Sequence, residues 1–336
     1  MAPFGYLPVE ASRYWFIFFN TLAILLAAYF LLRLFKFTLA SVAAPALLLA
    51  MFCTEKNVTN TLVFGNINGP ILLLEVLFFR WLLDGNRSHE WWAGVAIGLT
   101  LVVKPLLAPL LLLPLLNRQW RALVTAFAVP PAVFNAVAWP LISDPMSFVT
   151  RTLPYILSTR DYFNSSILGN GVYYGLPMWL IMLLRVAFAV LGAASLWLLY
   201  RHYRTRDPLF WMLTSSGVLL LTSWLVLSLG QGYYSMMLFP FLMTVVLPNS
   251  AIRSWVAWLA IYGFTTMDRW LLMHWPTTGR ALEYLKITYG WSLLSIVVFL
   301  VLLYRYLDAK DDGRLDDGID PPWVTQYAAS GAKPGG

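Results

Sequence analysis

Runs of apolar residues separated by short polar connections fill almost the whole chain. A helix needs about 20 apolar residues to cross the ~30 Å hydrocarbon layer of a bilayer, so each such run predicts a membrane segment. Eleven runs are candidates, at residues 13–35, 38–54, 62–83, 92–103, 105–116, 122–140, 176–200, 208–229, 233–248, 253–273 and 288–307. The pattern predicts an all-α fold, a polytopic membrane helix bundle with about eleven membrane segments.

Two neighbouring runs, 92–103 and 105–116, are too short for two full crossings. They meet at Lys104 and Pro105, and a proline lacks the backbone N–H that a continuing helix needs. We therefore expect a hairpin of part-length helices, which returns the chain to the side from which it came.

The basic residues orient these segments. Of the 23 Lys and Arg residues, fourteen fall on one set of connections, eight on the other, and Arg185 falls inside an apolar run. Because cytoplasmic loops carry the excess of basic residues, the C-terminus of this multi-pass cell-membrane protein is predicted to be cytoplasmic. Residues 308–336 mix aspartate with glycine and proline, so we expect a disordered cytoplasmic tail there, after a membrane domain at 1–307.

Composition supports a lipid environment and argues against other partners. Of the 336 residues 60% are hydrophobic and 12% charged, against roughly 25% charged in soluble domains. The net charge of +7 is not arranged as a basic stripe with interleaved aromatic residues, so the expected partner is the bilayer and not nucleic acid. One cysteine and three widely separated histidines predict neither a metal site nor a cofactor.

Polar residues that could carry chemistry gather on the connections assigned to the outer face. The longest of these, 141–177, contains Asp161, our candidate catalytic carboxylate if the chain is complete. Arg and Lys suit the phosphate of a lipid carrier, and Asn, Ser and Tyr suit sugar hydroxyls. The candidate substrate-binding residues are Asn66, Asn68, Lys104, Arg151, Arg160, Asn164, Ser165, Tyr233, Tyr234, Arg280 and Lys286.

The same residue types also occur near membranes without any catalytic role. Long basic side chains extend to the interface, and amides and hydroxyls cap helices or join them. Glu75 and Arg185 are charged residues inside apolar runs, and since unpaired charges there are costly we expect the two to form a structural ion pair.

Long stretches of the chain resemble glycosyltransferase family 87. The likeness is carried by FGNING (64–69), GLTLVVKPLLAPLLLLPLLNRQWRA (98–122) and RDYFNSSILGNGVYYGLP (160–177). Four further stretches resemble the arabinofuranosyltransferases of that family: SVAAPALLLAMF, SDPMSFVTRTLPYIL, SLGQGYYSMMLFPFLMTVVLPNS and RALEYLKITYGWSLL.

The resemblance implies a bundle of the GT-C glycosyltransferase type with its active site on the outer, periplasmic face. The implied donor is decaprenylphosphoryl-arabinose and the implied acceptor is arabinan. Transfer would create an α(1→3) bond, which makes branches in cell-wall arabinogalactan and lipoarabinomannan. Such inverting chemistry needs a carboxylate that takes the proton from the acceptor hydroxyl.

The family pattern places that carboxylate in a first outer loop, which has no counterpart in this chain. The opening MAPFGYLPVEASRYW resembles the stretch that follows the loop, so Met1 is expected to be an internal position of the family pattern. If the chain is complete, the acidic residues on the outer connections are the possible bases, and Asp161 is preferred among Glu10, Glu55, Asp144, Asp161, Asp268 and Glu283.

Three other interpretations stay open at this point. A mannosyltransferase using polyprenyl-phosphate-mannose shares the phosphate chemistry. A truncated, inactive remnant would still bind the lipid-linked sugar. A lipid-sugar transporter is a different class, for which paired broken helices in two symmetric halves are typical.

Overall fold

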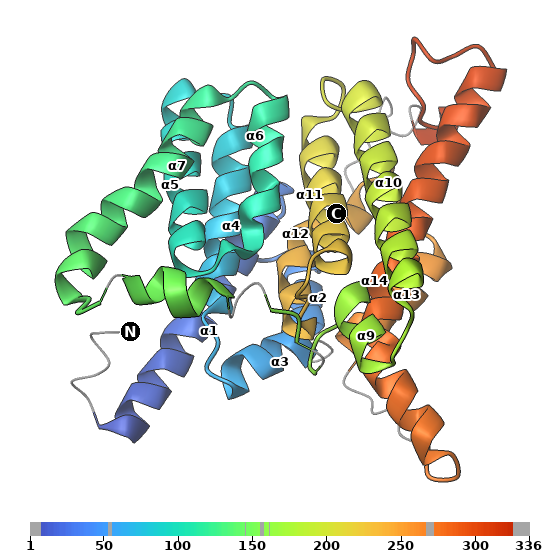
Figure 1. The fold of residues 1–336 in the computed structure, drawn as a ribbon. Coiled ribbons are helices and arrows are strands. Elements are labelled where there is room, and N and C mark those ends of the chain that lie inside the picture. The colour runs from blue at the N-terminus through green and yellow to red at the C-terminus, as the bar shows by residue number, and fades with distance from the viewer. Residues whose placement is uncertain are drawn as a thin grey trace. The chain divides into compact units, whose positions relative to one another are not determined.

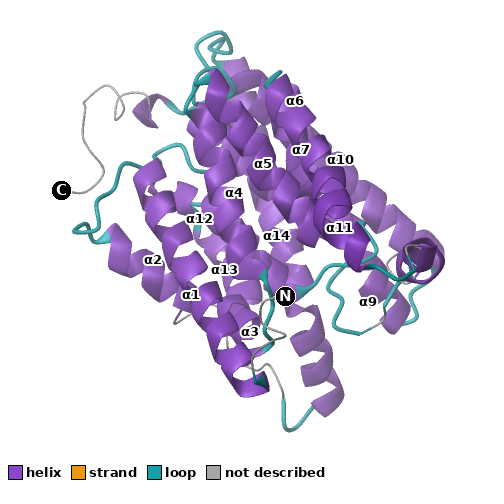
Figure 2. Cartoon of the chain, turned by 90° about the vertical axis from the view of Figure 1, so that its left-hand side faces the viewer, coloured by secondary structure: helices purple, strands orange, loops and turns teal. Residues whose placement is uncertain are grey.

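The computed structural model describes residues 8–52, 56–144, 146–154, 158–160, 162–266 and 272–324. Within these ranges the chain forms helices and connections without any strand (Figure 2), which confirms the all-α prediction. Two compact units are formed: unit 1 comprises Met1–Ala138 with Tyr233–Met237, and unit 2 comprises Trp139–Gly232 with Leu238–Gly336.

Unit 1 is built around four helices that lie side by side in the order α1, α4, α5 and α7 (Figure 1). Its elements are α1 (Val9–Leu34), α2 (Ala43–Phe52), α3 (Lys56–Val63), α4 (Asn68–Leu83), α5 (Arg87–Val103), the 3₁₀ helix η2 (Pro105–Leu111), α6 (Leu112–Leu116), α7 (Trp120–Val133) and the π-helical turn η3 (Phe134–Ala138). Two glycines bring α5 and α7 close together. A Cβ at Gly94 would lie 2.4 Å from the carbonyl oxygen of Ala122, and a Cβ at Gly98 would lie 2.9 Å from Cβ of Val129.

The chain breaks between α5 and η2 where the sequence predicts it. Lys104 has extended backbone angles (φ −162°, ψ 109°), because a following proline excludes the helical conformation at the residue before it. The next residues, from Pro105, continue as a 3₁₀ helix that packs back against α5. The break leaves the Lys104 side chain at the end of a helix.

Unit 2 is organised by α10, α11 and α14, which pack on one another, while α13 packs on α14 and α9 on α10. Its elements are η4 (Trp139–Leu141), η5 (Phe148–Thr152), α9 (Ile167–Tyr173), α10 (Met178–His202), α11 (Pro208–Val226), α12 (Phe239–Leu242), η7 (Met243–Val246), α13 (Trp255–Thr265) and α14 (Pro276–Asp311). The 3₁₀ helix η6 (Gly232–Leu238) belongs to unit 1 over Tyr233–Met237 and to unit 2 only at its two end residues. Trp224 of α11 and Trp291 of α14 lie with ring centroids 5.2 Å apart. These rings join the two helices within the buried interior of the unit.

Five helices in the described ranges are long and apolar enough to cross a membrane: Val9–Leu34, Trp120–Leu141, Met178–His202, Pro208–Val226 and Pro276–Asp311. The chain is therefore a multi-pass membrane protein, but the count of eleven segments is not confirmed. Several of the predicted runs form shorter helices, such as Pro105–Leu116 and Gly232–Val246. Prolines within those runs interrupt the α-helical hydrogen bonding and leave 3₁₀ turns in its place.

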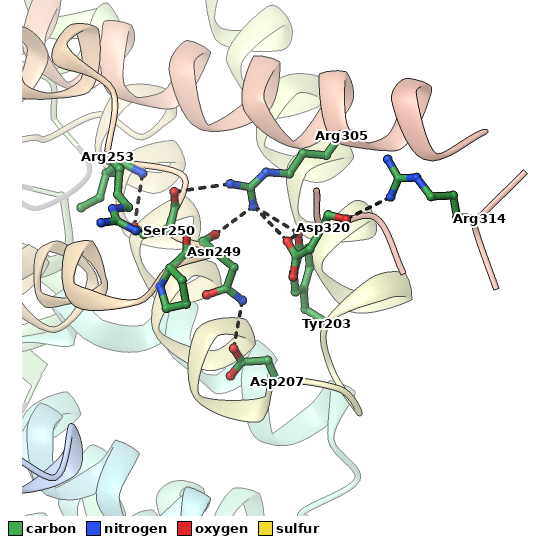
Figure 3. A network of polar contacts seen from close by, with 10 residues as sticks. Tyr203, Asp207, Asn249, Ser250, Arg253, Arg305, Arg314 and Asp320 are labelled. Atoms are coloured by element: carbon green, nitrogen blue, oxygen red, sulfur yellow. Dashed lines mark hydrogen bonds and ion pairs between the residues drawn. The ribbon is translucent and has the colours of Figure 1, made fainter. Parts of the chain in front are cut away.

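The described part of the predicted tail, 308–324, belongs to unit 2 and makes contacts with other elements of that unit. Asp320 accepts hydrogen bonds from the Tyr203 hydroxyl (2.6 Å) and from Arg305 (3.3 Å), as Figure 3 shows. Ile319 and Val324 are buried. The composition of the segment does not reveal these contacts, because the cation and the apolar surface that hold it belong to other elements. Residues 325–336 lie outside the described ranges.

Candidate functional site

Five of the predicted binding residues belong to one region of unit 1, and Lys104 lies at its centre. The Lys104 ammonium nitrogen is 4.7 Å from the ring centroid of Tyr233 and 4.6 Å from that of Tyr234. The same nitrogen donates a hydrogen bond of 3.4 Å to Oδ1 of Asn68. Aromatic faces and an amide oxygen both stabilise a cation without neutralising it.

No carboxylate forms an ion pair with Lys104 within the described ranges. Its side chain is partly buried, and this burial lowers the pKa of Lys104 to about 8. A positive charge that is held by rings and an amide but not neutralised is suited to bind an anion. The site can therefore take a phosphate group as its counter-ion.

Hydrogen bonds to the Asn68 side chain and to the neighbouring residue 66 fix the position of Asn68. It is fully buried, and its side-chain nitrogen donates to the Thr61 hydroxyl at 3.3 Å. The neighbouring Asn66 contributes its main-chain carbonyl, which accepts a hydrogen bond of 2.7 Å from the side chain of Asn20. Asn20 and Thr61 are not among the residues predicted from the sequence. A single amide in the apolar run 13–35 is a signal that could have drawn attention to Asn20.

Asn164 of unit 2 was predicted to bind substrate, but its side chain is fully occupied by the protein. Its nitrogen donates to the carbonyls of Arg160 (2.9 Å) and Ser228 (2.8 Å). Its oxygen accepts from the backbone N–H groups of Ser166 and Gly230, both at 3.0 Å. An amide has two donors and two acceptor lone pairs, so Asn164 has no hydrogen-bonding capacity left for a sugar and fixes the connection after residue 160.

Ser165 also takes part in this internal network. Its carbonyl accepts from the Thr288 hydroxyl (2.8 Å), which in turn accepts from Asn170 (2.6 Å). All three residues are buried. The network joins the long connection to α9 and α14, and this gives Ser165 a structural role in the described geometry.

Replacing Asn164 by alanine is expected to lower the stability of the folded protein by about 2 kcal/mol, because two carbonyls and two N–H groups lose their partner in a buried place. The change is measured as a lower midpoint of thermal unfolding in detergent. Asn135→Ala is the matched control, since Asn135 is exposed and makes only a local bond to Pro131. Equal midpoints for the two variants would contradict the structural role of Asn164.

The remaining predicted cations are distributed over unit 2. Lys286 is buried and bonds to Glu283 at 2.7 Å, so its charge is already paired. Arg151 and Arg280 are exposed, and Arg160 is half-buried. The structure therefore brings together the binding candidates of unit 1 more closely than those of unit 2.

The candidate base Asp161 lies outside the described residues, as do Glu55 and Asp268. Glu10 and Asp144 are exposed, and Asp144 accepts a hydrogen bond from the Met146 backbone. The part of the chain that the structure describes holds no group of three or more His, Cys, Asp or Glu side chains that could bind a metal ion.

The two charged residues inside apolar runs have separate surroundings. Arg185 donates from Nε to the Val226 carbonyl at 2.7 Å. Glu75 is fully buried in unit 1, and among the described residues its carboxylate oxygens have no hydrogen-bond partner. The predicted ion pair between the two is not confirmed, because neither Glu75 oxygen accepts a hydrogen bond from a described residue.

Apolar helices of membrane-spanning length and a partly buried lysine that no described carboxylate pairs define a membrane protein with a place where an anion can bind. The sequence model of glycosyltransferase family 87 matches residues 1–228, and the chain belongs to this family. An α-(1→3)-arabinofuranosyltransferase of Mycolicibacterium smegmatis is 74% identical to it, over 97% of this chain and 75% of that protein.

Two other relatives carry the same name. The protein of Mycobacterium tuberculosis is 75% identical over 97% of this chain and 75% of its own length. That of Corynebacterium glutamicum is 41% identical over 91% of this chain and 72% of its own length. No solved structure matches the chain significantly.

Proposed function

We propose that this protein is an α-(1→3)-arabinofuranosyltransferase that uses decaprenylphosphoryl-arabinose as donor and arabinan as acceptor. The observation that carries the proposal is the identity of 74% to an enzyme of that name over 97% of the chain. The uncompensated cation of unit 1 supports a phosphate-linked donor. The products are branches in cell-wall arabinogalactan and lipoarabinomannan.

In this proposal Lys104 binds the phosphate of the carrier lipid. As the bond between the sugar C1 and the phosphate oxygen breaks, the electron pair stays with the phosphate and its negative charge grows. An ammonium already held in place by Asn68, Tyr233 and Tyr234 stabilises that charge without having to reorganise. The side chain of Asn66 in the same unit is a candidate for contacts with sugar hydroxyls.

The other half of the reaction is attack by the acceptor. Its 3-hydroxyl oxygen forms the new bond to C1 while a carboxylate takes the hydroxyl proton. If the chain is complete, Asp161 is our candidate for this carboxylate. The exposed Arg151 and Arg280 are candidates for contacts with the phosphate or the acceptor.

We place the reaction on the outer, periplasmic face of a bundle of the GT-C type, with about eleven membrane segments and the C-terminus in the cytoplasm. The excess of Lys and Arg on one set of connections supports this orientation. Lys104 then lies at the depth of the lipid head groups, where the carrier phosphate resides.

The pH dependence of donor use follows from the environment of Lys104. Since burial lowers its pKa to about 8, the ammonium loses its proton above that pH, whereas an ordinary lysine keeps it to about 10.4. We expect kcat/KM for the donor to fall by up to about tenfold per pH unit above pH 8. Lys104→Arg keeps its charge and should remove this decline. A wild-type profile that is flat to about pH 9.5 contradicts the assignment.

The proposed function is tested by incubating the purified protein with radiolabelled decaprenylphosphoryl-arabinose and a synthetic α(1→5) arabinan. We expect label in the polymer and release of decaprenyl phosphate. Label from polyprenyl-phosphate-mannose in its place would identify a mannosyltransferase. Binding of the donor without any transfer would identify an inactive lipid-sugar binder.

A further inference from the structure

The N-terminus of α4 lacks the usual local cap. Its first N–H groups have no partner within the helix, and Ile67, the residue at the N-cap, cannot supply one. Asn20, in the middle of α1, supplies it instead. Its Oδ1 accepts from the Gly69 N–H at 2.8 Å, and its Nδ2 donates to the Asn66 carbonyl at 2.7 Å.

This contact depends on very close approach of the two helices. A Cβ at Gly69 would lie 2.3 Å from Oδ1 of Asn20 and 2.6 Å from its main-chain oxygen. Gly65, at the start of the same turn, has φ +61°, which glycine adopts without strain. The turn 65–69 is therefore held in one position against α1.

Asn68, the hydrogen-bond partner of Lys104, is one of the two residues that lie between the bonded groups. Asn20 bonds to the backbone at residues 66 and 69, and Asn68 reaches Lys104 at 3.4 Å. Any rotation of the turn moves the Asn68 amide and with it the oxygen that orients the ammonium. The contacts form a continuous path from α1 to the cation.

We infer that Asn20 is a positioning residue for the donor phosphate, which acts by holding the 66–69 turn and thereby Asn68 and Lys104 in place. This inference rests on the proposed function, in which Lys104 binds that phosphate. Asn20 does not touch the donor. A merely structural brace between α1 and α4 would affect folding but would not act through Lys104.

The two roles are separated by a double-mutant cycle on Asn20→Ala and Lys104→Gln. We expect Asn20→Ala to raise KM for decaprenylphosphoryl-arabinose about tenfold, the equivalent of one hydrogen bond, with kcat and the acceptor KM within about twofold. The double variant should be no worse than Lys104→Gln within about twofold, because Asn20 acts only through the lysine. Effects that multiply would overturn the inference.

A second readout avoids dependence on catalysis. Decaprenyl phosphate, which carries no sugar, is titrated against each variant, and we expect about tenfold weaker binding for Asn20→Ala. Asn135→Ala should bind as the wild type does. If Asn20→Ala does not fold, Thr61→Val is used in its place, because the Thr61 hydroxyl bonds to the Asn68 side chain. We expect Thr61→Val to bind decaprenyl phosphate more weakly than the wild type. Unchanged binding would contradict the inference.

The outcomes also separate this inference from the proposed function. Binding and transfer unaffected by Lys104→Gln would refute the phosphate site itself, and the inference with it. A strong effect of Lys104→Gln together with wild-type behaviour of Asn20→Ala would refute the positioning role alone.

Discussion

Lys104→Gln is expected to lower kcat/KM for the lipid-linked donor about 10²-fold while the KM for arabinan changes less than about twofold. Glutamine keeps a polar side chain, one atom shorter than that of lysine, but it carries no charge. The loss therefore isolates the electrostatic contribution of the ammonium, which grows as the phosphate departs. Steady-state kinetics with the donor and the acceptor varied separately measure it.

Lys104→Arg is the matched variant for this prediction. It keeps the charge and can stack on the two tyrosine rings, so it should retain most of the activity that glutamine loses. If both variants fall equally, the side-chain shape and not the charge is essential, and the phosphate role is wrong. If neither falls, the cation has no part in the reaction.

Arg305→Met is expected to destabilise unit 2 by about 3 kcal/mol, at the lower end of the range for a broken buried pair because Asp320 is 24% exposed. The arginine donates to the carbonyl of Asn249 (2.8 Å), to the Tyr203 hydroxyl (3.2 Å) and to Asp320 (3.3 Å). Burial raises the pKa of Asp320, and Tyr203 and Arg305 act in the opposite direction. Methionine would remove the cation that lies beside this carboxylate.

Thermal unfolding in detergent measures the effect, and Arg253→Met is the control in the same unit. Arg253 is exposed and donates a long hydrogen bond of 3.4 Å to the Pro248 carbonyl (Figure 3). We expect a clear fall in the unfolding midpoint for Arg305→Met and almost none for Arg253→Met. Similar midpoints would show that the network does not hold residues 312–324 in place.

The helical architecture could be predicted from the apolar pattern because membrane helices depend on local composition. The break at Lys104 was predictable for the same reason, since a proline constrains its own neighbour. The number of full-length spans could not be predicted from the apolar pattern. Prolines such as Pro109 and Pro240 shorten helices within runs that are continuous in composition.

The candidate site could be predicted in part. Residue type and position at helix ends pointed to Asn68, Lys104, Tyr233 and Tyr234, which the fold brings together. The sequence did not reveal which hydrogen-bond partner each polar group has in the folded protein. Asn164 looks like a sugar ligand in the sequence, yet its four hydrogen bonds include partners more than 60 residues away, which no local pattern contains.

The segment after α14 illustrates the same limitation. Its aspartates and glycines are typical of solvated chain, but Asp320 is bonded to Tyr203, 117 residues earlier in the sequence. A charged residue is costly to bury only while it has no partner. The composition of a segment gives the number of its charged residues, but it does not reveal a bonding partner that lies in another element of the fold.

The central claim is tested most directly by linkage analysis of the product made from labelled decaprenylphosphoryl-arabinose and α(1→5) arabinan, with the Mycolicibacterium smegmatis relative assayed in parallel. We predict labelled arabinofuranose joined through O3 of the acceptor residues, so that methylation analysis yields residues branched at O3 and O5. Label joined through O2 or O5, or no label where the relative transfers it, would contradict the assignment of this chain as an α-(1→3)-arabinofuranosyltransferase.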